Sequence, residues 1–302
     1  MSDFGVSFSL KYAREMGIDP QACLKLALKD LGVKRLRLMS YWDIHEPQSG
    51  RYDFTDLDWQ FKLAKNYGAR VSLALGLRQP RWPESHWPDW VDQTNTTTWV
   101  PQLSRFINAV VNRYKDHPSL SSWQLENEAL LKTFGQNGNF DRIRLIDEYK
   151  LVKQLDPRNP VIMTTSDSWG LPIRKPRPDI YGISLYRRFY DRGKYRRSHR
   201  PAFFYKMRAA FIQASTSKPV FIHELQAEPW GPKATVDMSL TDQQKTMTAD
   251  YFVQTIRFAV STGLSPTYLW GLEWWYWLLI KHHDESLWRA AKKVFYQKKF
   301  FT

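Results

Sequence analysis

The sequence contains a single cysteine, Cys23, among its 302 residues. One cysteine cannot form an internal disulfide, so the covalent framework gives no sign of an oxidising compartment. Long apolar runs are also missing, and the longest extends only from Trp274 to Ile280. This run is far shorter than the about 20 residues that span a bilayer. The sequence therefore predicts no transmembrane segment, and Cys23 is interpreted as an inert helix residue.

The first residues, MSDFGVSFSL, lack the charged start and the longer apolar stretch of a signal peptide. Taken at face value, this start predicts a cytoplasmic protein, or an extracytoplasmic one if an upstream signal or anchor has been removed. Acidic residues are few beside basic ones: 30 Asp and Glu stand against 44 Lys and Arg, a net charge of +14. This excess favours anionic partners or surfaces without identifying one.

Motifs for cofactors are also missing. No glycine-rich phosphate loop follows the first predicted strand, which disfavours a dinucleotide-binding fold. Neither His45-Glu46 nor His223-Glu224 has metal-ligand spacing, because neighbouring residues on a strand point in opposite directions. No nucleic-acid-binding module is visible, and aromatic residues interrupt the basic stretch. We therefore expect no cofactor, no metal and no nucleic-acid partner.

What the chain does contain is an alternation of strand-like and helix-like stretches. One helix is opened by Asp19 and Pro20 and closed by Gly32, and a second is capped by Thr55 and ends at Gly68. Strands that alternate with helices need parallel pairing with crossover helices, and eight such units suit a closed barrel better than an open doubly wound sheet. The predicted strands are 4–8, 35–39, 70–75, 120–125, 160–164, 180–185, 219–223 and 267–271.

The length and composition fit one domain. A chain of 302 residues with 43% hydrophobic residues can bury one large core, and it is close to the roughly 250 residues typical of an eight-stranded α/β barrel. No repeat of fixed period and no low-complexity linker is visible. The predicted fold is a single (β/α)8 barrel over residues 1–302.

Two predicted strands end in glutamate. Glu128 follows strand 120–125 and Glu224 follows strand 219–223. The carboxyl ends of barrel strands gather on one face, where active sites are built, so the two side chains can face each other across a bound sugar. Retaining glycoside hydrolysis needs two carboxyl groups about 5 to 5.5 Å apart, one that attacks the anomeric carbon and one that protonates the leaving oxygen.

This chemistry needs unequal pKa values, because the acid must hold its proton near neutrality while the nucleophile stays ionised. Tyr186, at the end of strand 180–185, is placed to donate to the Glu224 carboxylate and keep it charged. Asn127 would suit a hydrogen bond to the sugar 2-hydroxyl, which strengthens in the transition state.

The pair Asn127-Glu128 together with Glu224 resembles the signature of glycoside hydrolase clan A, and the likeness spans nearly the whole chain. The resemblance implies that Glu128 is the acid/base and Glu224 the nucleophile, usually acting on equatorial β-glycosidic bonds. It also implies that Arg37 is a partner of the nucleophile and that Trp270 forms a floor on which a sugar stacks.

The segment 41–54, which includes Tyr41 and Trp42, is similar to the loop after the second strand in family 42 and family 35 β-galactosidases. Other segments look more like family 5 cellulases. Family 5 usually carries a histidine two residues before the tyrosine at position 186, whereas this chain has Ser184. The particular family and its substrate therefore stay open.

The loop after strand 70–75 concentrates tryptophans and prolines beside the expected cleft. Sugar rings bury their C–H faces on aromatic rings, while their hydroxyls take nearby charged and amide groups. The competing interpretation is an aromatic minicore that supports a long loop, and both interpretations can hold for different residues. The predicted substrate-binding residues are Arg37, Tyr41, Trp42, Gln79, Arg81, Trp82, His86, Asn127, Tyr186, Trp270, Glu273 and Trp275.

Other glutamates have plainer interpretations. Glu126 is expected in helix packing or in a salt bridge. Glu228 either binds sugar hydroxyls or anchors an arginine and holds loops together, and the second interpretation is favoured. Glu273 is the better candidate for the substrate pocket. A lone histidine such as His86 is more often structural than in contact with a substrate.

Basic residues crowd the segments 187–200 and 174–177, which follow the sixth and fifth predicted strands. Both segments should open onto the catalytic face, so one hypothesis is an anionic glycan or docking to an acidic envelope surface. The other is a solvated basic rim. The predicted function is a retaining glycoside hydrolase that cleaves a β-glycosidic bond in an oligo- or polysaccharide. The alternatives are a non-catalytic carbohydrate-binding barrel and a transglycosidase acting on an anionic cell-envelope glycan.

Overall fold

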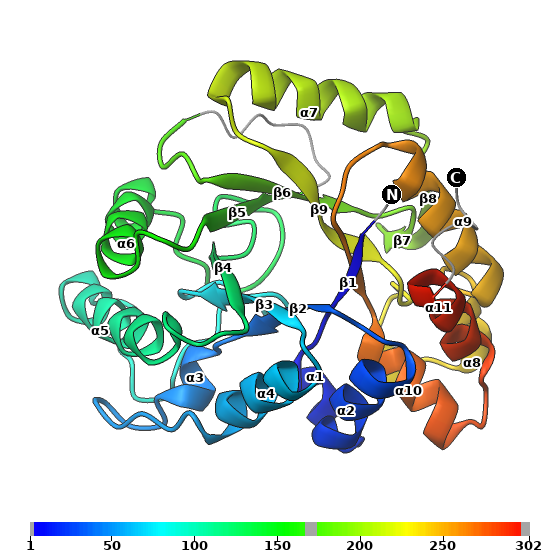
Figure 1. The fold of residues 1–302 in the computed structure, drawn as a ribbon, viewed down its shortest axis with the longest axis horizontal. Helices are drawn as coiled ribbons and strands as arrows, with labels where there is room; N and C mark the ends of the chain where they lie inside the picture. Colours follow the sequence, from blue (N-terminus) through cyan, green and yellow to red (C-terminus); the bar gives the residue numbers. More distant parts are fainter. Residues whose placement is uncertain (1–2, 167–173, 297–302) are drawn as a thin grey trace.

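The computed structural model describes residues 3–166 and 174–296. Eight parallel strands close into a barrel in the order β1-β10-β9-β6-β5-β4-β3-β2, and helices surround it (Figure 1). The predicted (β/α)8 fold is confirmed, and the ends of each predicted strand lie within three residues of the observed ends. The barrel strands are β1 (Phe4–Ser7), β2 (Arg35–Met39), β3 (Arg70–Leu75), β4 (Leu120–Leu125), β5 (Val161–Thr165), β6 (Ile180–Leu185), β9 (Val220–Gln226) and β10 (Thr267–Trp270).

Helices follow most strands and cover the outside of the barrel. In the described part of the chain, no helix is both long enough and apolar enough to cross a membrane. The helices are α1 (Leu10–Glu15), α2 (Pro20–Asp30), α3 (Trp42–His45), α4 (Thr55–Asn66), α5 (Thr96–Tyr114), α6 (Arg142–Leu155), α7 (Ala202–Thr216), α8 (Leu240–Gln244), α9 (Ala249–Ser261), α10 (Leu272–Lys281) and α11 (Ser286–Tyr296), with a 3-10 turn at Thr235–Asp237.

Of the two predicted helix caps, one is confirmed and the other is wrong. Asp19 caps α2, because its carboxylate accepts from the backbone N–H groups of residues 21 and 22 and Pro20 is the first helical residue. The predicted cap at Thr55 is wrong: Thr55 is already the first residue of α4, and Phe54 occupies the cap position. Instead, the Asp53 carboxylate accepts from the Thr55 N–H at 2.9 Å. A carboxylate two residues earlier therefore does the work expected of the hydroxyl.

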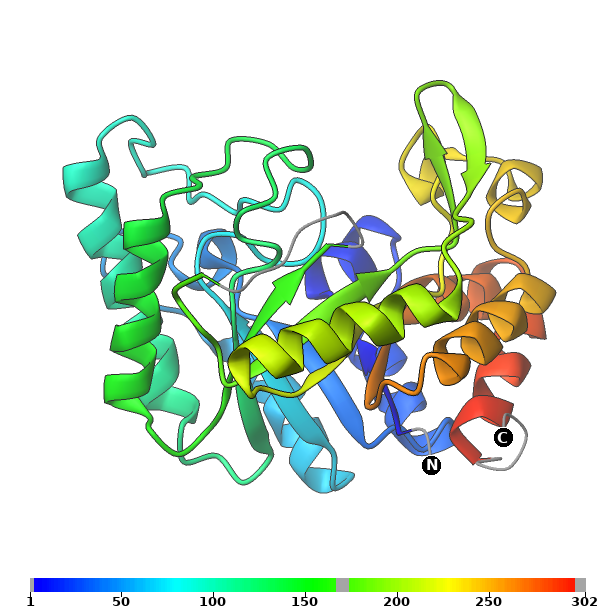
Figure 2. The same ribbon diagram turned by 90° about the horizontal axis from the view of Figure 1, so that it is seen from above.

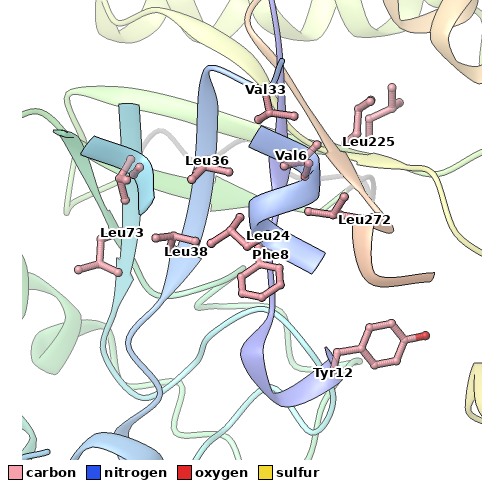
Figure 3. Packing of buried hydrophobic residues seen from close by; sticks show 14 of the residues in the cluster. Val6, Phe8, Tyr12, Leu24, Val33, Leu36, Leu38, Leu73, Leu225 and Leu272 are labelled. Atoms are coloured by element: carbon pink, nitrogen blue, oxygen red, sulfur yellow. The ribbon is translucent and has the colours of Figure 1, made fainter. Parts of the chain in front are cut away.

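Alternation along the strands separates two layers of side chains. Leu36 and Leu38 of β2 point outward and join a core that includes Leu24 of α2, as Figure 3 shows. Arg37, between the two leucines, is fully buried and belongs to the barrel interior. The outward layer fastens helices to the barrel, and the inward layer leaves polar groups in its centre.

A two-stranded hairpin interrupts the regular alternation. Strands β7 (Arg188–Asp191) and β8 (Lys194–Arg197) pair antiparallel between β6 and α7. The sequence predicted a loop and the start of a helix here, because neither face of the hairpin is apolar enough to give a period of two. Figure 2 shows the hairpin rising on the side of the long loops after β3 and β4, away from the termini. The insertion therefore stands at the face where the strands end.

A buried ion cluster fastens the loop after β4 to helix α6. Arg144 of α6 donates to Glu126 at 2.7 Å and also to Glu148 on the same helix. All three side chains are nearly inaccessible to solvent, and burial raises the pKa of Glu148 to about 8. Glu126 thus has the salt-bridge role predicted for it, two residues before Glu128.

We expect Arg144→Met to lower the free energy of unfolding by about 3–5 kcal/mol, because it leaves two buried carboxyl groups without their cation. Urea denaturation at neutral pH measures the loss. The control is Lys150→Met on the same helix, whose ion pair with Asp147 is exposed and should contribute less than about 1 kcal/mol. Equal losses for the two variants would contradict the structural role of the cluster.

Candidate active site

Glu224 lies inside strand β9, which extends to Gln226 and so beyond its predicted end. Both oxygens of its buried carboxylate accept hydrogen bonds. Arg37 donates from Nη1 to Oε2 at 2.5 Å, and Tyr186 donates from its hydroxyl to Oε1 at 2.6 Å. A guanidinium and a hydroxyl thus hold the two carboxylate oxygens in place. The contacts predicted for Arg37 and Tyr186 are therefore present.

Arg37 is held from three directions inside the barrel. Besides Glu224, it donates from Nε to Gln124 Oε1 at 2.7 Å and from Nη2 to Asn127 Oδ1 at 2.8 Å. Gln124 is an inward-facing residue of β4 and is fully buried. A buried guanidinium needs such partners, because an unpaired one would carry a large desolvation cost. The cation therefore has one fixed position between β4 and β9.

Glu128 has a different environment from Glu224. Its side chain is half-buried, and its Oε1 accepts a single hydrogen bond, from the Ser184 hydroxyl at 2.6 Å. Burial first, and then the charge of Glu224, raise the pKa of Glu128 to about 7, although the Ser184 hydroxyl acts in the opposite direction. A carboxyl group with this pKa keeps its proton near neutral pH.

The backbone around Glu128 adopts an uncommon conformation. Glu126 has a φ of +49° and Glu128 a φ of +44°, in the left-handed region that side chains other than glycine seldom enter. Hydrogen bonds hold this turn: the Asn127 N–H donates to the Arg78 carbonyl at 2.7 Å, and the Glu128 N–H donates to the Thr164 hydroxyl at 2.8 Å. Strain of this kind is typical of functional sites, where the surroundings fix one geometry.

A third carboxyl group, Glu84, lies next to this turn. It is buried and has a φ of +73°, and its Oε2 accepts from Asn127 Nδ2 at 2.9 Å and lies 3.7 Å from Arg78 Nη2. Burial first, with contributions from the charges of Glu128 and Glu224, raises the pKa of Glu84 to about 8. No sequence pattern indicates a role for Glu84, because it lies in a loop nine residues after β3.

The orientation of the Asn127 amide is fixed by these neighbours. Its oxygen accepts from Arg37 and, at 3.2 Å, from the Thr164 hydroxyl, while its nitrogen donates to Glu84. The amide nitrogen has two hydrogens, so one remains for a ligand. Asn127 is nearly buried, so this N–H is the main group that it can offer to a ligand.

Aromatic rings extend from the carboxylates to the surface. Tyr186, which donates to Glu224, packs edge-on against Trp230 with ring centroids 4.9 Å apart. Trp230 lies 5.7 Å from Phe134, and Phe134 lies 5.8 Å from Trp82, whose side chain is 58% exposed. These four residues form an aromatic arc of the kind on which sugar rings pack. Trp82 and Tyr186 were predicted, whereas Phe134 and Trp230, which lie in the loops after β4 and β9, were missed.

Six of the predicted substrate-binding residues lie behind this surface. Their side chains are fully or almost fully buried, and each has a polar atom within hydrogen-bond distance of another protein group. The Gln79 amide, for example, donates to the Ser40 carbonyl at 2.7 Å, and the Trp275 indole donates to the Ala227 carbonyl at 2.7 Å. The structure gives these residues no surface for a sugar and assigns them to loop support, in correction of the prediction. They are Tyr41, Trp42, Gln79, His86, Glu273 and Trp275.

Arg81 and Trp270 are also engaged by the protein. Arg81 binds both carboxylate oxygens of Glu228, at 2.5 and 2.9 Å, and lies 3.5 Å from Glu273. Its guanidinium carbon is 4.1 Å from the centre of a Trp270 ring. Glu228 therefore anchors an arginine, as the favoured interpretation predicted. The guanidinium covers one face of Trp270, so the predicted stacking floor is partly occupied by Arg81.

The buried histidines have separate structural contacts. His45 Nδ1 is 2.8 Å from the Asp53 carbonyl, and His223 Nε2 is 3.4 Å from the Ser72 hydroxyl. Within residues 3–166 and 174–296, no three His, Cys, Asp or Glu side chains gather in a way that could hold a metal ion.

We expect two substitutions to move the pKa of Glu128 in opposite directions. Glu224→Gln should lower it, because a negative charge that disfavours ionisation is removed and Arg37 loses its counter-ion. Ser184→Ala should raise it, because the charged form loses its hydrogen bond. NMR titration of the labelled Glu128 carboxyl in the three proteins measures both shifts. Shifts of the same sign would contradict this electrostatic account.

Known proteins resemble this chain in sequence over part of its length and in fold over nearly all of it. A sequence model of the family described as beta-galactosidase, Glyco_hydro_42, matches residues 25–158. Beta-galactosidase 11 of Arabidopsis thaliana is 25% identical over 187 residues, which are 51% of this chain and 22% of that protein. The match therefore spans about a fifth of the plant protein's length.

Solved structures extend the likeness beyond this region. A GH5_18 protein from Bifidobacterium longum subsp. longum, in complex with Manβ1-4GlcNAc, covers 99% of this chain with a TM-score of 0.69 and 14% identity; the match spans 79% of that chain. A beta-galactosidase from the Antarctic haloarchaeon Halorubrum lacusprofundi covers 89% of this chain and 52% of its own, with a TM-score of 0.57 and 14% identity. At these identities the structures show the fold. The chain thus has the (β/α)8 fold of the clan A glycoside hydrolases, and its predicted resemblance to that clan is confirmed.

Proposed function

We propose that this protein is a retaining glycoside hydrolase that cleaves a β-glycosidic bond in an oligo- or polysaccharide. Glu224 is the nucleophile and Glu128 the acid/base. The observation that carries the proposal is the contrast between the two carboxyl groups. Glu224 accepts hydrogen bonds from Arg37 and Tyr186 on its two oxygens, whereas the pKa of Glu128 is raised to about 7. The beta-galactosidase relatives and the disaccharide complex support a carbohydrate substrate.

In the first step, a Glu224 oxygen attacks the anomeric carbon and forms a glycosyl ester. The bond to the leaving oxygen breaks, and that oxygen takes the proton of Glu128. Arg37 and Tyr186 hold the carboxylate in place before the attack, so little reorganisation is needed in the transition state. The remaining amide hydrogen of Asn127 is placed to donate to a sugar hydroxyl.

In the second step, Glu128 takes a proton from water, the hydroxide attacks the anomeric carbon, and the ester bond to Glu224 breaks. Glu128 changes from acid to base because its electrostatic environment changes between the two steps. The charge of Glu224 contributes to the raised pKa of Glu128, and this charge disappears when Glu224 becomes an ester. The pKa of Glu128 then falls, which makes it available as a base.

A protein that only bound carbohydrate would not need this arrangement. Two carboxyl groups with opposed environments, one of them on a strained turn, cost stability without improving the binding of a neutral sugar. These features favour turnover over a binding barrel.

Product analysis with added azide tests the two roles separately. In Glu224→Ala, azide takes the place of the nucleophile and should give a glycosyl azide of inverted configuration. In Glu128→Ala, azide should attack the glycosyl ester and give a retained product. We expect each variant without azide to lose a factor of about 10²–10⁴ or more in kcat on unactivated substrates. A panel of aryl β-glycosides and β-linked oligosaccharides, followed by NMR, provides the readout.

The pH profile of the wild type is a second readout of the same proposal. Because the acid must be protonated, kcat/KM should fall as the pH rises through about 7, the pKa of Glu128. Full activity of Glu224→Ala without azide would overturn the nucleophile assignment. Tight glycan binding by a wild type that turns over no β-glycoside would instead identify a binding barrel.

We expect Glu84 to act as a positioning residue through Asn127. Glu84→Ala should lower kcat/KM by on the order of tenfold, because the Asn127 amide loses its acceptor. Glu84→Gln keeps an oxygen for that bond and should retain most activity at neutral pH. The alkaline limb should stay near pH 7 in Glu84→Gln, because Glu84, with a pKa of about 8, is still neutral where Glu128 titrates. Equal losses in both variants would indicate a merely structural role.

A further inference from the structure

The β7–β8 hairpin is attached to the strand that carries the nucleophile. The side chain of Gln226, two residues after Glu224 on β9, accepts from the N–H groups of Arg187 and Arg188 at 2.9 and 3.0 Å. It also donates to the Arg188 carbonyl. Gln226 is buried, so these bonds fix the base of the hairpin relative to Glu224.

The two faces of the hairpin have different neighbours, because directly paired residues of an antiparallel ribbon share a face. Phe189 pairs with Arg196, and its ring lies 6.3 Å from Trp230, so this face turns toward the aromatic arc. Arg188 pairs with Arg197 and lies over the Tyr251 ring at 3.7 Å, so the other face turns toward α9. The arc therefore continues from Trp230 onto the hairpin.

The hairpin carries more positive charge than its neighbours neutralise. Residues 188–197 contain five Arg or Lys and one acid, Asp191, which pairs with Arg196. In the described segments, no carboxylate lies within ion-pair distance of Arg192, Lys194 or Arg197, and all three residues are exposed. These three cations are free to bind an anionic ligand.

Positively charged residues stand at two places where they destabilise the folded hairpin. Arg188 and Arg197 are direct cross-strand neighbours, and like charges in such positions destabilise a sheet. At the tip, Arg192 has a φ of +48°, at a turn position where Asn, Asp or Gly is preferred. Solubility alone would require neither the Arg188–Arg197 pair nor an arginine at the turn. An anion lying along the hairpin would offset the repulsion between Arg188 and Arg197.

We propose that the β7–β8 hairpin binds anionic sugar units of the glycan substrate. Arg192 at the tip and Lys194 on the Phe189 face pair with carboxylate or ester-linked acidic groups while the aromatic arc packs against sugar faces, and Arg197 adds positive charge from the opposite face. The proposal rests on the proposed function, because it adds a substrate class to that site. A glycan fits better than a nucleic acid, since Arg192 and Lys194 stand beside an aromatic arc that leads to the two carboxyl groups.

The test compares two soluble β-1,4-glucans with the same backbone, one carboxymethylated and one hydroxyethylated, by affinity gel electrophoresis of the full chain. The variant carries Arg192→Gln, Lys194→Gln and Arg197→Gln. We expect its affinity for the carboxymethyl glucan to fall at least about tenfold, with its affinity for the neutral glucan unchanged. Raising the salt should weaken only the binding of the charged glucan by the wild type.

The matched control removes the same charge elsewhere through Lys25→Gln, Lys62→Gln and Lys150→Gln, at exposed positions of α2, α4 and α6. An equal loss in this control would overturn the proposal in favour of the general positive field. An unchanged affinity in the hairpin variant would overturn it as well.

A phosphorylated glucan distinguishes the acidic groups, and tighter hairpin-dependent binding of single-stranded DNA or of phosphatidylglycerol vesicles would reassign the surface. Hydrolysis of neutral β-glycosides reports on the proposed function separately, since the hairpin variant should retain it.

Discussion

The buried guanidinium of Arg37 is the interaction on which the candidate site depends. It connects Glu224 on β9 with Gln124 on β4 and with Asn127 on the turn that follows. One cation therefore holds both the Glu224 carboxylate and the Asn127 amide beside Glu128. Because a buried cation is costly without good partners, its position and those of its acceptors depend on one another.

Around Arg37, two similar side chains have different environments. Glu224 has a cation and a phenol for its oxygens, whereas Glu128 has one hydroxyl and half-buried surroundings. The turn that carries Glu128 is held by Thr164 and Arg78 on one side, and by the ion cluster of Glu126 on the other. The difference in environment therefore rests on several loops as well as on the barrel.

Charge is used in two ways on the catalytic face. Arg81 and Arg144 are neutralised by buried glutamates and hold loops in place. The cations of the β7–β8 hairpin extend toward solvent, and three of them have no carboxylate partner in the described part of the chain. The net charge of +14 thus includes structural arginines as well as an exposed group beside the aromatic arc.

The sequence alone determined the barrel, the strand positions, the placement of Glu128 and Glu224 at strand ends and the Arg37 and Tyr186 contacts, because these follow from apolar periodicity and from residues at strand ends. Only the tertiary structure decided which loop residues reach the surface. Trp275 and His86 look like sugar ligands in the sequence, yet folding buries them, whereas Phe134 and Trp230 become part of the arc. Glu84 meets Asn127 across 43 residues of chain, and no local pattern encodes a contact between two loops.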